Sequence, residues 1–312
     1  MAATQPIRAP ASQAASPGQH TSRWWILTKA MPFLAPVHLL VLGVIVIPAF
    51  YVIWLSATSS TFGKAPTFVG FANYAHALTD PYFWRALRNT IVVVLIVVHV
   101  ELAVGLGMAL LFASGLPARR WLLAAVLAPY AVSEVSAAVI WRFLFDADVG
   151  PVTVALNAMG LPSLEWSIVP AHGLIIIAML SIWLHLPFTF IILYAARLAI
   201  PTQLYEAAKV YAVSALQTFR YITLPLLMPA ILVAMLFRYI FAFRLFSEVW
   251  LMTQGGPARS TEVLAVYLYR EALRFSAFGS AAATGWLMVL ISLLLGAGYI
   301  WGLRRQMMTD AA

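Results

Sequence analysis

Long apolar runs alternate with shorter polar segments over nearly the whole chain. Each run holds the roughly 20 apolar residues that a helix needs to cross the hydrocarbon core of a bilayer. The pattern therefore predicts an all-α polytopic membrane protein with six transmembrane helices. We place the runs near Pro36–Leu55, Asn89–Ala113, Trp121–Phe145, Ala171–Ala195, Leu226–Met252 and Ala281–Leu303.

The stretch before the first run, residues 1–30, is rich in Ala, Ser, Pro and Gln and opens without an apolar core. This composition predicts a disordered cytoplasmic tail rather than a cleavable signal peptide. The remaining chain then forms one six-helix membrane domain over residues 31–306, with a polar cytoplasmic loop over residues 198–225.

The composition agrees with this class. Of 312 residues, 63% are hydrophobic and 10% are charged, whereas a soluble domain carries roughly 25% charged residues. The chain has no cysteine, which excludes disulfides and thiol catalysis. It also lacks an H-E-x-x-H motif, a paired-carboxylate constellation and a Ser/His/Asp pattern. We therefore predict no catalytic residue, no metal site and no enzymatic activity.

The net charge of +8 is best explained by membrane orientation. Arginines concentrate in the short segment with Arg119 and Arg120 and in the terminal segment with Arg304 and Arg305. Cytoplasmic segments carry an excess of Lys and Arg, so we expect both termini to be cytoplasmic. The basic charge then needs no nucleic-acid partner.

The polar stretch YEAAKVYAVSALQTFRYITLPLLMPA, which starts at Tyr205, separates the fourth and fifth runs. We expect Thr202 to cap a short helix there and Ser214 to cap a second helical turn. A helix with small residues on one face lets another backbone approach closely. The alternative is an ordinary loop helix that lies on the membrane surface.

The same stretch resembles the EAA signature of ABC importer membrane subunits, whose pattern is E-A-A, then D-G-A, then I-x-L-P. Tyr211 and Ala212 stand where the family usually has Asp and Gly. The positions that fit are Glu206, Ala207, Ala208, Phe219, Ile222, Leu224 and Pro225.

Three further segments resemble the same family in the same order: FVGFANY, a run ending in Trp-Arg before DADVG, and LMTQGGPARSTEVLAVYLY. Together the matches cover roughly residues 32–305. The carbohydrate-uptake subfamily of the maltose-transporter type is the most similar.

This resemblance implies a permease subunit whose loop helix docks on a cytoplasmic ATPase. The expected partners are a second, homologous permease subunit, an ATP-binding cassette ATPase dimer and an extracytoplasmic sugar-binding protein, with the lipid bilayer around them. No cofactor is expected on this chain, because ATP would bind the partner ATPase and the chain has no G-x-x-x-x-G-K-[ST] motif. The implied ATPase-coupling residues are Glu206, Ala207, Ala208, Lys209, Tyr211, Ala212 and Phe219.

The resemblance also places a substrate path on the fourth and fifth spans. Aligned positions suggest that two phenylalanines stack on a sugar ring and that His185 and Arg238 bind hydroxyl groups. Other roles stay open for the charged residues: Arg238 could pair with Glu134 or Glu101, Arg244 could pair with Glu248 at i+4, and His185 could be a core histidine. The implied path residues are Leu184, His185, Phe188, Arg238, Phe241, Ala242 and Leu245.

The fifth run resembles that of disaccharide importers, trehalose-like ones among them, so the resemblance implies a di- or oligosaccharide as cargo. The intramembrane arginines leave room for an anionic cargo such as a sugar phosphate or glycerol phosphate. A proton-coupled secondary transporter using Glu101 and Glu134 is a further alternative, although the sequence shows no internal inverted repeat.

Overall fold

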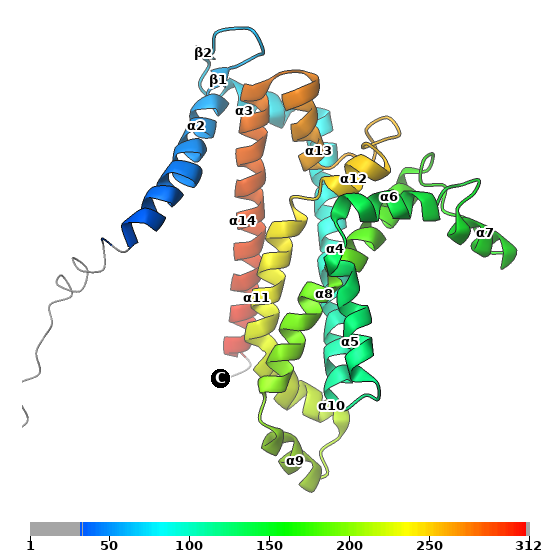
Figure 1. Ribbon diagram of the computed structural model, residues 1–312. Coiled ribbons are helices and arrows are strands. Elements are labelled where there is room, and N and C mark those ends of the chain that lie inside the picture. Colours follow the sequence, from blue (N-terminus) through cyan, green and yellow to red (C-terminus); the bar gives the residue numbers. More distant parts are fainter. Residues whose placement is uncertain (1–31, 33, 310–312) are drawn as a thin grey trace, which may run out of the picture. The chain divides into compact units, whose positions relative to one another are not determined.

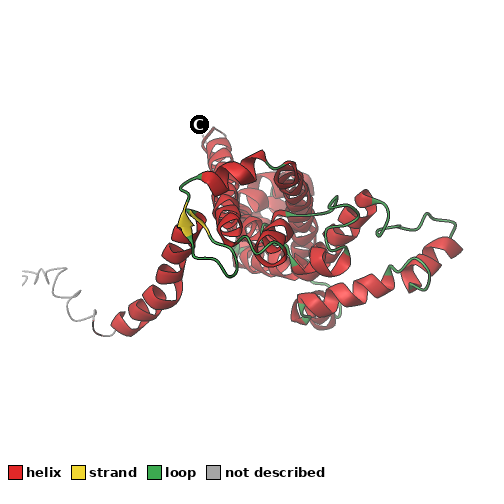
Figure 2. Cartoon of the chain, turned by 90° about the horizontal axis from the view of Figure 1, so that it is seen from above, coloured by secondary structure: helices red, strands yellow, loops and turns green. Residues whose placement is uncertain are grey.

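The computed structural model describes residues 32 and 34–309, and helices make up nearly all of it (Figure 1 and Figure 2). The predicted tail, residues 1–30, lies outside the described residues. Contacts within the chain divide it into a unit that ends at Val52 and a unit that begins at Ile53.

The first candidate span runs over Leu34–Ser56. It contains a π-helical segment at Leu42–Val46 and continues as α2 (Ile47–Ser56). Large apolar side chains such as Val44 and Phe50 are exposed along it. Exposed apolar side chains on a helix of this length are what a lipid-facing span requires.

Four long helices form the bundle of the second unit. The most extensive packing is between α4 and α8, and α11 contacts α4, α8 and α14 (Figure 1). Helices α4 and α8 approach so closely that a Cβ on Gly105 would lie 3.3 Å from the backbone nitrogen of Phe190. Small residues permit such close contact between membrane helices. The four helices are α4 (Pro81–Ala113), α8 (Pro170–Ala199), α11 (Leu224–Ala242) and α14 (Phe278–Thr309).

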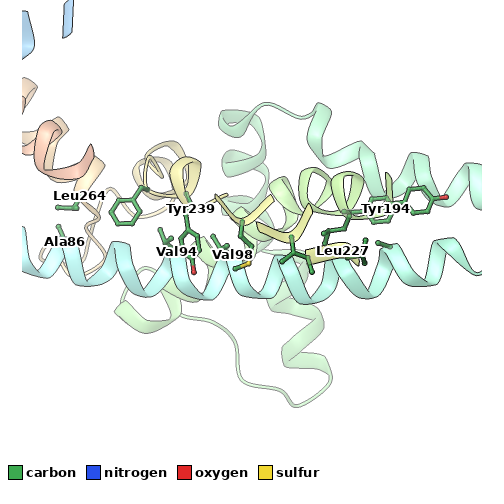
Figure 3. Packing of buried hydrophobic residues seen from close by; sticks show 14 of the residues in the cluster. Ala86, Val94, Val98, Tyr194, Leu227, Tyr239 and Leu264 are labelled. Carbon is green, nitrogen blue, oxygen red and sulfur yellow. The ribbon is translucent and has the colours of Figure 1, made fainter. Parts of the chain in front are cut away.

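A core of buried apolar side chains runs along α4. Figure 3 shows Val94 and Val98 of α4 facing Tyr239 and Leu227 of α11. This core continues to Tyr194 on α8. The apolar runs therefore do more than match the bilayer, because one stripe of α4 also holds the bundle together.

Local sequence explains where the two central helices begin. Asp80 precedes α4 and accepts a hydrogen bond of 2.9 Å from the backbone nitrogen of Tyr82, and Pro81 occupies the first helical position. Pro170 likewise starts α8. Proline suits this position because its missing N–H would have no partner in the first turn.

The third apolar run does not form one continuous helix, contrary to the prediction. It forms α5 (Arg119–Leu127), a 3-10 turn at Ala128–Ala131 and α6 (Glu134–Leu144), with a bend of 100° between the two halves. Pro129 lacks the N–H that a continuing helix needs. The Ser133 side chain then accepts from the backbone nitrogen of Ser136 and starts a new helix.

The fifth run is also shorter than predicted. Helix α11 ends at Ala242 rather than near Met252, and a separate helix α12 (Ser247–Met252) follows a non-helical segment. Phe243 and Leu245 in this segment are buried, and α12 packs on α6 and α8. Tertiary burial of these side chains therefore breaks a helix that has no proline or glycine at the break.

Short elements fill the two ends of the bundle. Helices α9 and α10 lie at one end, and α12 and α13 lie at the other (Figure 1). Two π-helical turns, Phe219–Thr223 and Arg270–Arg274, precede α11 and follow α13. The remaining elements are β1 (Thr58–Ser59) paired antiparallel with β2 (Thr67–Phe68), α3 (Ala72–Thr79), α7 (Pro151–Ala158), α9 (Thr202–Val210), α10 (Ala215–Thr218) and α13 (Leu264–Tyr269).

Within residues 34–309, five helices are long and apolar enough to cross a membrane, and the bent α5–α6 pair makes a sixth if it counts as one span. This confirms the predicted class of an all-helical membrane protein.

Candidate functional site

A cavity of about 540 Å³ lies between the α5–α6 bend, α8 and the α11–α12 break. Six of the seven residues predicted for the substrate path line it. These six come from two helices and the break: Leu184, His185, Arg238, Phe241, Ala242 and Leu245. Their role in transport stays a prediction.

Phe188, the seventh predicted residue, lies behind this wall. Its ring centroid is 6.2 Å from that of Phe241 and 6.4 Å from that of Phe237. Both contacts are close to perpendicular, which is a favoured aromatic geometry. Phe188 therefore supports the exposed ring of Phe241 from the side instead of lining the cavity.

Arg238 forms a buried ion pair with Glu101 of α4. Its Nε donates to Glu101 Oε2 at 2.5 Å and its Nη2 donates to Oε1 at 2.8 Å. Arg238 is 2% exposed and Glu101 is 0% exposed. Two of the five guanidinium N–H groups are thus committed to the carboxylate, and three remain for other acceptors. Of the pairings considered from sequence, the one with Glu101 is confirmed.

His185 is both anchored in its own helix and open to the cavity. Its Nδ1 donates to the Ser181 carbonyl oxygen at 2.9 Å, which requires the proton on that nitrogen. Its Nε2 lies 3.9 Å from Oε1 of Glu134 at the start of α6. When the ring is neutral, Nε2 is therefore an acceptor that faces the α5–α6 bend.

The predicted alternative of an Arg244–Glu248 pair is wrong. Because α11 ends at Ala242 and α12 starts at Ser247, the two residues do not lie one turn apart on one helix. Arg244 is exposed and forms no ion pair with any described residue, while Glu248 is buried. Both line the cavity instead.

The predicted substrate path left out three charged residues and one tyrosine of this wall. Each residue was visible as a polar or aromatic side chain in an apolar run, a signal that often marks a pathway. The helix breaks that turn them toward the cavity were not predicted. The four are Tyr130, Glu134, Arg244 and Glu248.

The polar loop forms α9, a tight turn and α10 at the opposite end from α12. Ser214 caps α10 as predicted, because its side chain accepts from Gln217 N while the Gln217 side chain accepts from Ser214 N. The expected cap at Thr202 is wrong: Thr202 is the first residue of α9, and Pro201 precedes it without a capping side-chain bond.

The turn after α9 keeps a left-handed residue although glycine is missing. Ala212 has φ 52°. The Val213 nitrogen donates to Ala208 O at 2.9 Å, and the Ala212 nitrogen donates to Lys209 O at 3.1 Å. These two bonds define a Schellman motif, in which glycine is the usual residue at the position of Ala212. Alanine in place of the family's usual glycine thus adds backbone strain at position 212 but leaves the turn in place.

The predicted coupling residues differ in how far their side chains are exposed to solvent. Glu206, Ala207 and Lys209 are exposed, and Tyr211 projects with 81% of its surface exposed. Ala208 is only 6% exposed. It packs against its own chain and cannot present its side chain to a partner, contrary to expectation.

The Gly-Gly-Pro segment makes a structural turn at the other end. Thr253 Oγ1 and Thr261 Oγ1 are 2.7 Å apart, and Thr261 Oγ1 donates to Gly256 O. Asn89 of α4 donates to the carbonyl oxygens of Ser260 and Glu262. This network fastens the turn between α12 and α13 to the start of α4.

The same end holds a tyrosine with a perturbed pKa. The Tyr267 hydroxyl donates to Asp80 Oδ2 at 2.8 Å. Burial, together with this hydrogen bond, raises the pKa of Tyr267. The phenol therefore stays protonated and remains a donor at neutral pH.

Among the described residues, no group of three or more His, Asp or Glu side chains could hold a metal ion.

Comparison with known proteins assigns the chain to a family. The model of the family described as "Binding-protein-dependent transport system inner membrane component" matches residues 101–307. The chain belongs to this family. The resemblance to ABC importer permeases is thus confirmed, as is the prediction of a multi-pass transport subunit rather than an enzyme.

Individual relatives of this permease span most of its length. It is 34% identical over 275 residues to the sulfoquinovosyl glycerol transport system permease protein SmoG of Agrobacterium fabrum, covering 87% of this chain and 89% of that one. It is 32% identical over 237 residues to the trehalose/maltose transport system permease protein MalF of Thermococcus litoralis, covering 76% and 80%.

A solved structure has the same fold. A chain of the bacterial alginate ABC transporter, crystallised with an alginate pentasaccharide-bound periplasmic protein, superposes on this permease with a TM-score of 0.77. The two chains are 21% identical, and the match covers 88% of this chain and 94% of that one.

Proposed function

We propose that this permease is half of the membrane path of an ATP-driven importer of di- or oligosaccharides, and that its cargo passes through the cavity between α8 and the α11–α12 break. The observation that carries the proposal is the wall of that cavity. It combines an exposed aromatic ring, Phe241, with hydrogen-bonding groups from His185, Arg238 and Glu248. Sugars offer apolar faces and many hydroxyl groups, so this mixture suits them.

The charges in the wall favour an uncharged sugar. Glu101 already compensates the charge of Arg238. The remaining charged residues of the wall are Arg244, Glu134 and Glu248. An anionic cargo would therefore meet two carboxylates and only one arginine, Arg244, that has no ionic partner among the described residues. The relative named for trehalose and maltose transport supports a disaccharide of this kind.

An anionic sugar is the second candidate. It is supported by the relative named for sulfoquinovosyl glycerol transport and by the solved transporter of the acidic polysaccharide alginate. Sugar phosphates and glycerol phosphate belong to the same class of cargo. Arg244, exposed at the cavity, is the residue that would meet such an anion.

Coupling to ATP hydrolysis is assigned to the loop of α9 and α10. Glu206, Ala207, Lys209 and Tyr211 are exposed there and would dock on the ATPase dimer. Ala212 forms the left-handed turn after α9, and the half-buried Phe219 follows α10. ATP binds that partner, and this chain needs no cofactor. A homologous second permease completes the path, and an extracytoplasmic sugar-binding protein delivers cargo to the end with α12 and α13. Both termini and the loop are then cytoplasmic.

The test uses the full complex reconstituted in vesicles, with uptake of a panel of labelled neutral and anionic sugars measured with and without ATP. Phe241→Ala should raise the KM for the transported sugar, because it removes the stacking surface. Phe237→Ala is a matched control: it lies one turn away on α11 and both rings are 45% exposed, but Phe237 does not line the cavity.

Equal effects of the two substitutions would contradict the assignment of the cavity. Uptake that needs a proton gradient and ignores ATP would instead favour a secondary transporter. A strong preference for anionic sugars would select the second candidate cargo.

A further inference from the structure

A second cavity, separate from the transport cavity, lies where α9 and α10 join the bundle. Its volume is about 420 Å³, and it shares no lining residue with the first. Its walls come from the end of α4, the end of α8 and the loop elements α9 and α10. The loop elements and the ends of two spans therefore meet at this cavity, which we call the joint.

Two cations line this joint. They are Arg197 of α8 and Lys209 of α9, and no carboxylate of the described chain lines the cavity with them. Neither cation forms an ion pair with a described residue. The Arg197 guanidinium instead lies 3.9 Å from the centre of the Tyr205 ring, an arrangement that holds its position while leaving its charge uncompensated.

The rest of the lining is mainly apolar, with a few hydroxyl groups. Leu110 and Ala113 contribute apolar surface from the last turn of α4. Tyr205 and Thr223 contribute hydroxyl groups that contact each other at 3.1 Å. A ligand that satisfies both parts has an anionic group and an apolar body.

The position of the joint identifies the class of ligand. Ala113 ends the candidate span of α4, and Arg197 lies two residues before the end of the span of α8. A cavity at the ends of two spans lies at the level where lipid headgroups meet acyl chains. Basic pockets between membrane helices on the cytoplasmic side commonly bind anionic headgroups.

We propose that this cavity binds one anionic phospholipid, with its phosphate between Arg197 and Lys209 and its first acyl carbons against Leu110 and Ala113. The bound lipid would brace α9 against α4 and α8. Its binding does not depend on the cargo. The cytoplasmic position of the cavity and the expected effect on ATPase coupling rest on the proposed function.

The experiment measures lipid binding to the full complex in neutral detergent without nucleotide, by titration with phosphatidylglycerol and native mass spectrometry. Arg197→Gln should weaken phosphatidylglycerol binding about fivefold, since a cation near a headgroup contributes about 1 kcal/mol. Arg220→Gln is the matched control: Arg220 is exposed in the same loop region and does not line the cavity. It should leave binding unchanged.

The same titration tests the second cation and the choice of lipid. Lys209→Gln should weaken phosphatidylglycerol binding as Arg197→Gln does, and lipid binding is its only readout because Lys209 also lies on the proposed docking surface. Equal binding of phosphatidylcholine, or equal loss in Arg220→Gln, would overturn the site. Displacement of phosphatidylglycerol by millimolar inorganic phosphate would overturn the lipid assignment, because it would show that the cavity binds a free anion. In vesicles, phosphatidylglycerol should raise sugar-stimulated ATP hydrolysis in the unmodified complex and not in Arg197→Gln. Retained lipid binding without this stimulation would count against the bracing role alone.

Discussion

Arg238 and Glu101 join α11 to α4 through two parallel hydrogen bonds at the edge of the cavity between α8 and the α11–α12 break. Both side chains are buried, so neither charge has water as an alternative partner. Arg238 therefore has two functions in this account. It links two spans, and it offers its remaining N–H groups to the cavity.

Breaking this pair should destabilise the protein. Glu101→Gln leaves a buried arginine without its counter-ion, which typically costs about 3–5 kcal/mol. We expect a clear fall in the unfolding midpoint measured by fluorescence-detected size exclusion. The double variant Glu101→Leu/Arg238→Leu should recover much of the loss, because no unpaired charge remains.

Arg244→Gln is the control for this prediction. Arg244 lines the same cavity but is exposed and has no described ionic partner, so its loss should change stability by less than about 0.5 kcal/mol. If Arg244→Gln and Glu101→Gln lowered the midpoint equally, the assignment of the buried pair would be wrong.

The sequence was sufficient to predict the spans, because apolar runs of this length are typical of helices that cross a bilayer. It did not predict where two of them break. Pro129 and Ser133 carry a local signal for the bend between α5 and α6. The break after Ala242 has none, since it depends on burial of Phe243 and Leu245 and on packing of α12 against α6.

This break also explains which site residues were missed. On a continuous helix Glu248 would lie one turn from Arg244, and the i+4 rule would pair them. The break turns Glu248 into the cavity wall instead. The six path residues that do meet there were placed by resemblance to a family, which carries tertiary information that local patterns lack.

Ala212 stores backbone strain that glycine would relieve. An L-residue in the left-handed region costs about 1–2 kcal/mol relative to its ordinary conformation, and Ala212 has φ 52°. Ala212→Gly should therefore stabilise the turn by roughly 1 kcal/mol and slow limited proteolysis of the loop. Ala207→Gly, inside α9, should do the opposite, because glycine in a helix is unfavourable. Faster cleavage of Ala212→Gly would show that the turn does not need this conformation.

Charge reversal at Glu206 tests the coupling role of the loop. Glu206 is exposed on α9, so Glu206→Lys should leave assembly in the membrane largely intact. We expect ATP hydrolysis to lose its link to sugar uptake in the reconstituted complex. Asp148→Lys reverses an exposed acid at the opposite end and should preserve coupling. Normal uptake by Glu206→Lys would remove Glu206 from the docking surface.

Carboxylates in the cavity should discriminate against anionic sugars. In Glu134→Gln, removal of one charge should strengthen inhibition of disaccharide uptake by a sugar phosphate about fivefold, equivalent to about 1 kcal/mol of lost repulsion. Competition assays at fixed ionic strength measure this directly. Asp148→Asn, outside the cavity, should have no such effect. Unchanged inhibition in Glu134→Gln would mean that the cargo does not pass close to this residue.

An ATPase in the cytoplasm can bind the loop of α9 and α10 only if this loop lies on the cytoplasmic side of the membrane. The chain has no cysteine, so Tyr211→Cys introduces a single thiol at a position that is 81% exposed. A membrane-impermeant maleimide should label this thiol in inside-out vesicles stripped of the ATPase, and rebinding of the ATPase should protect it. Labelling in intact cells, from the outer side, would contradict the account.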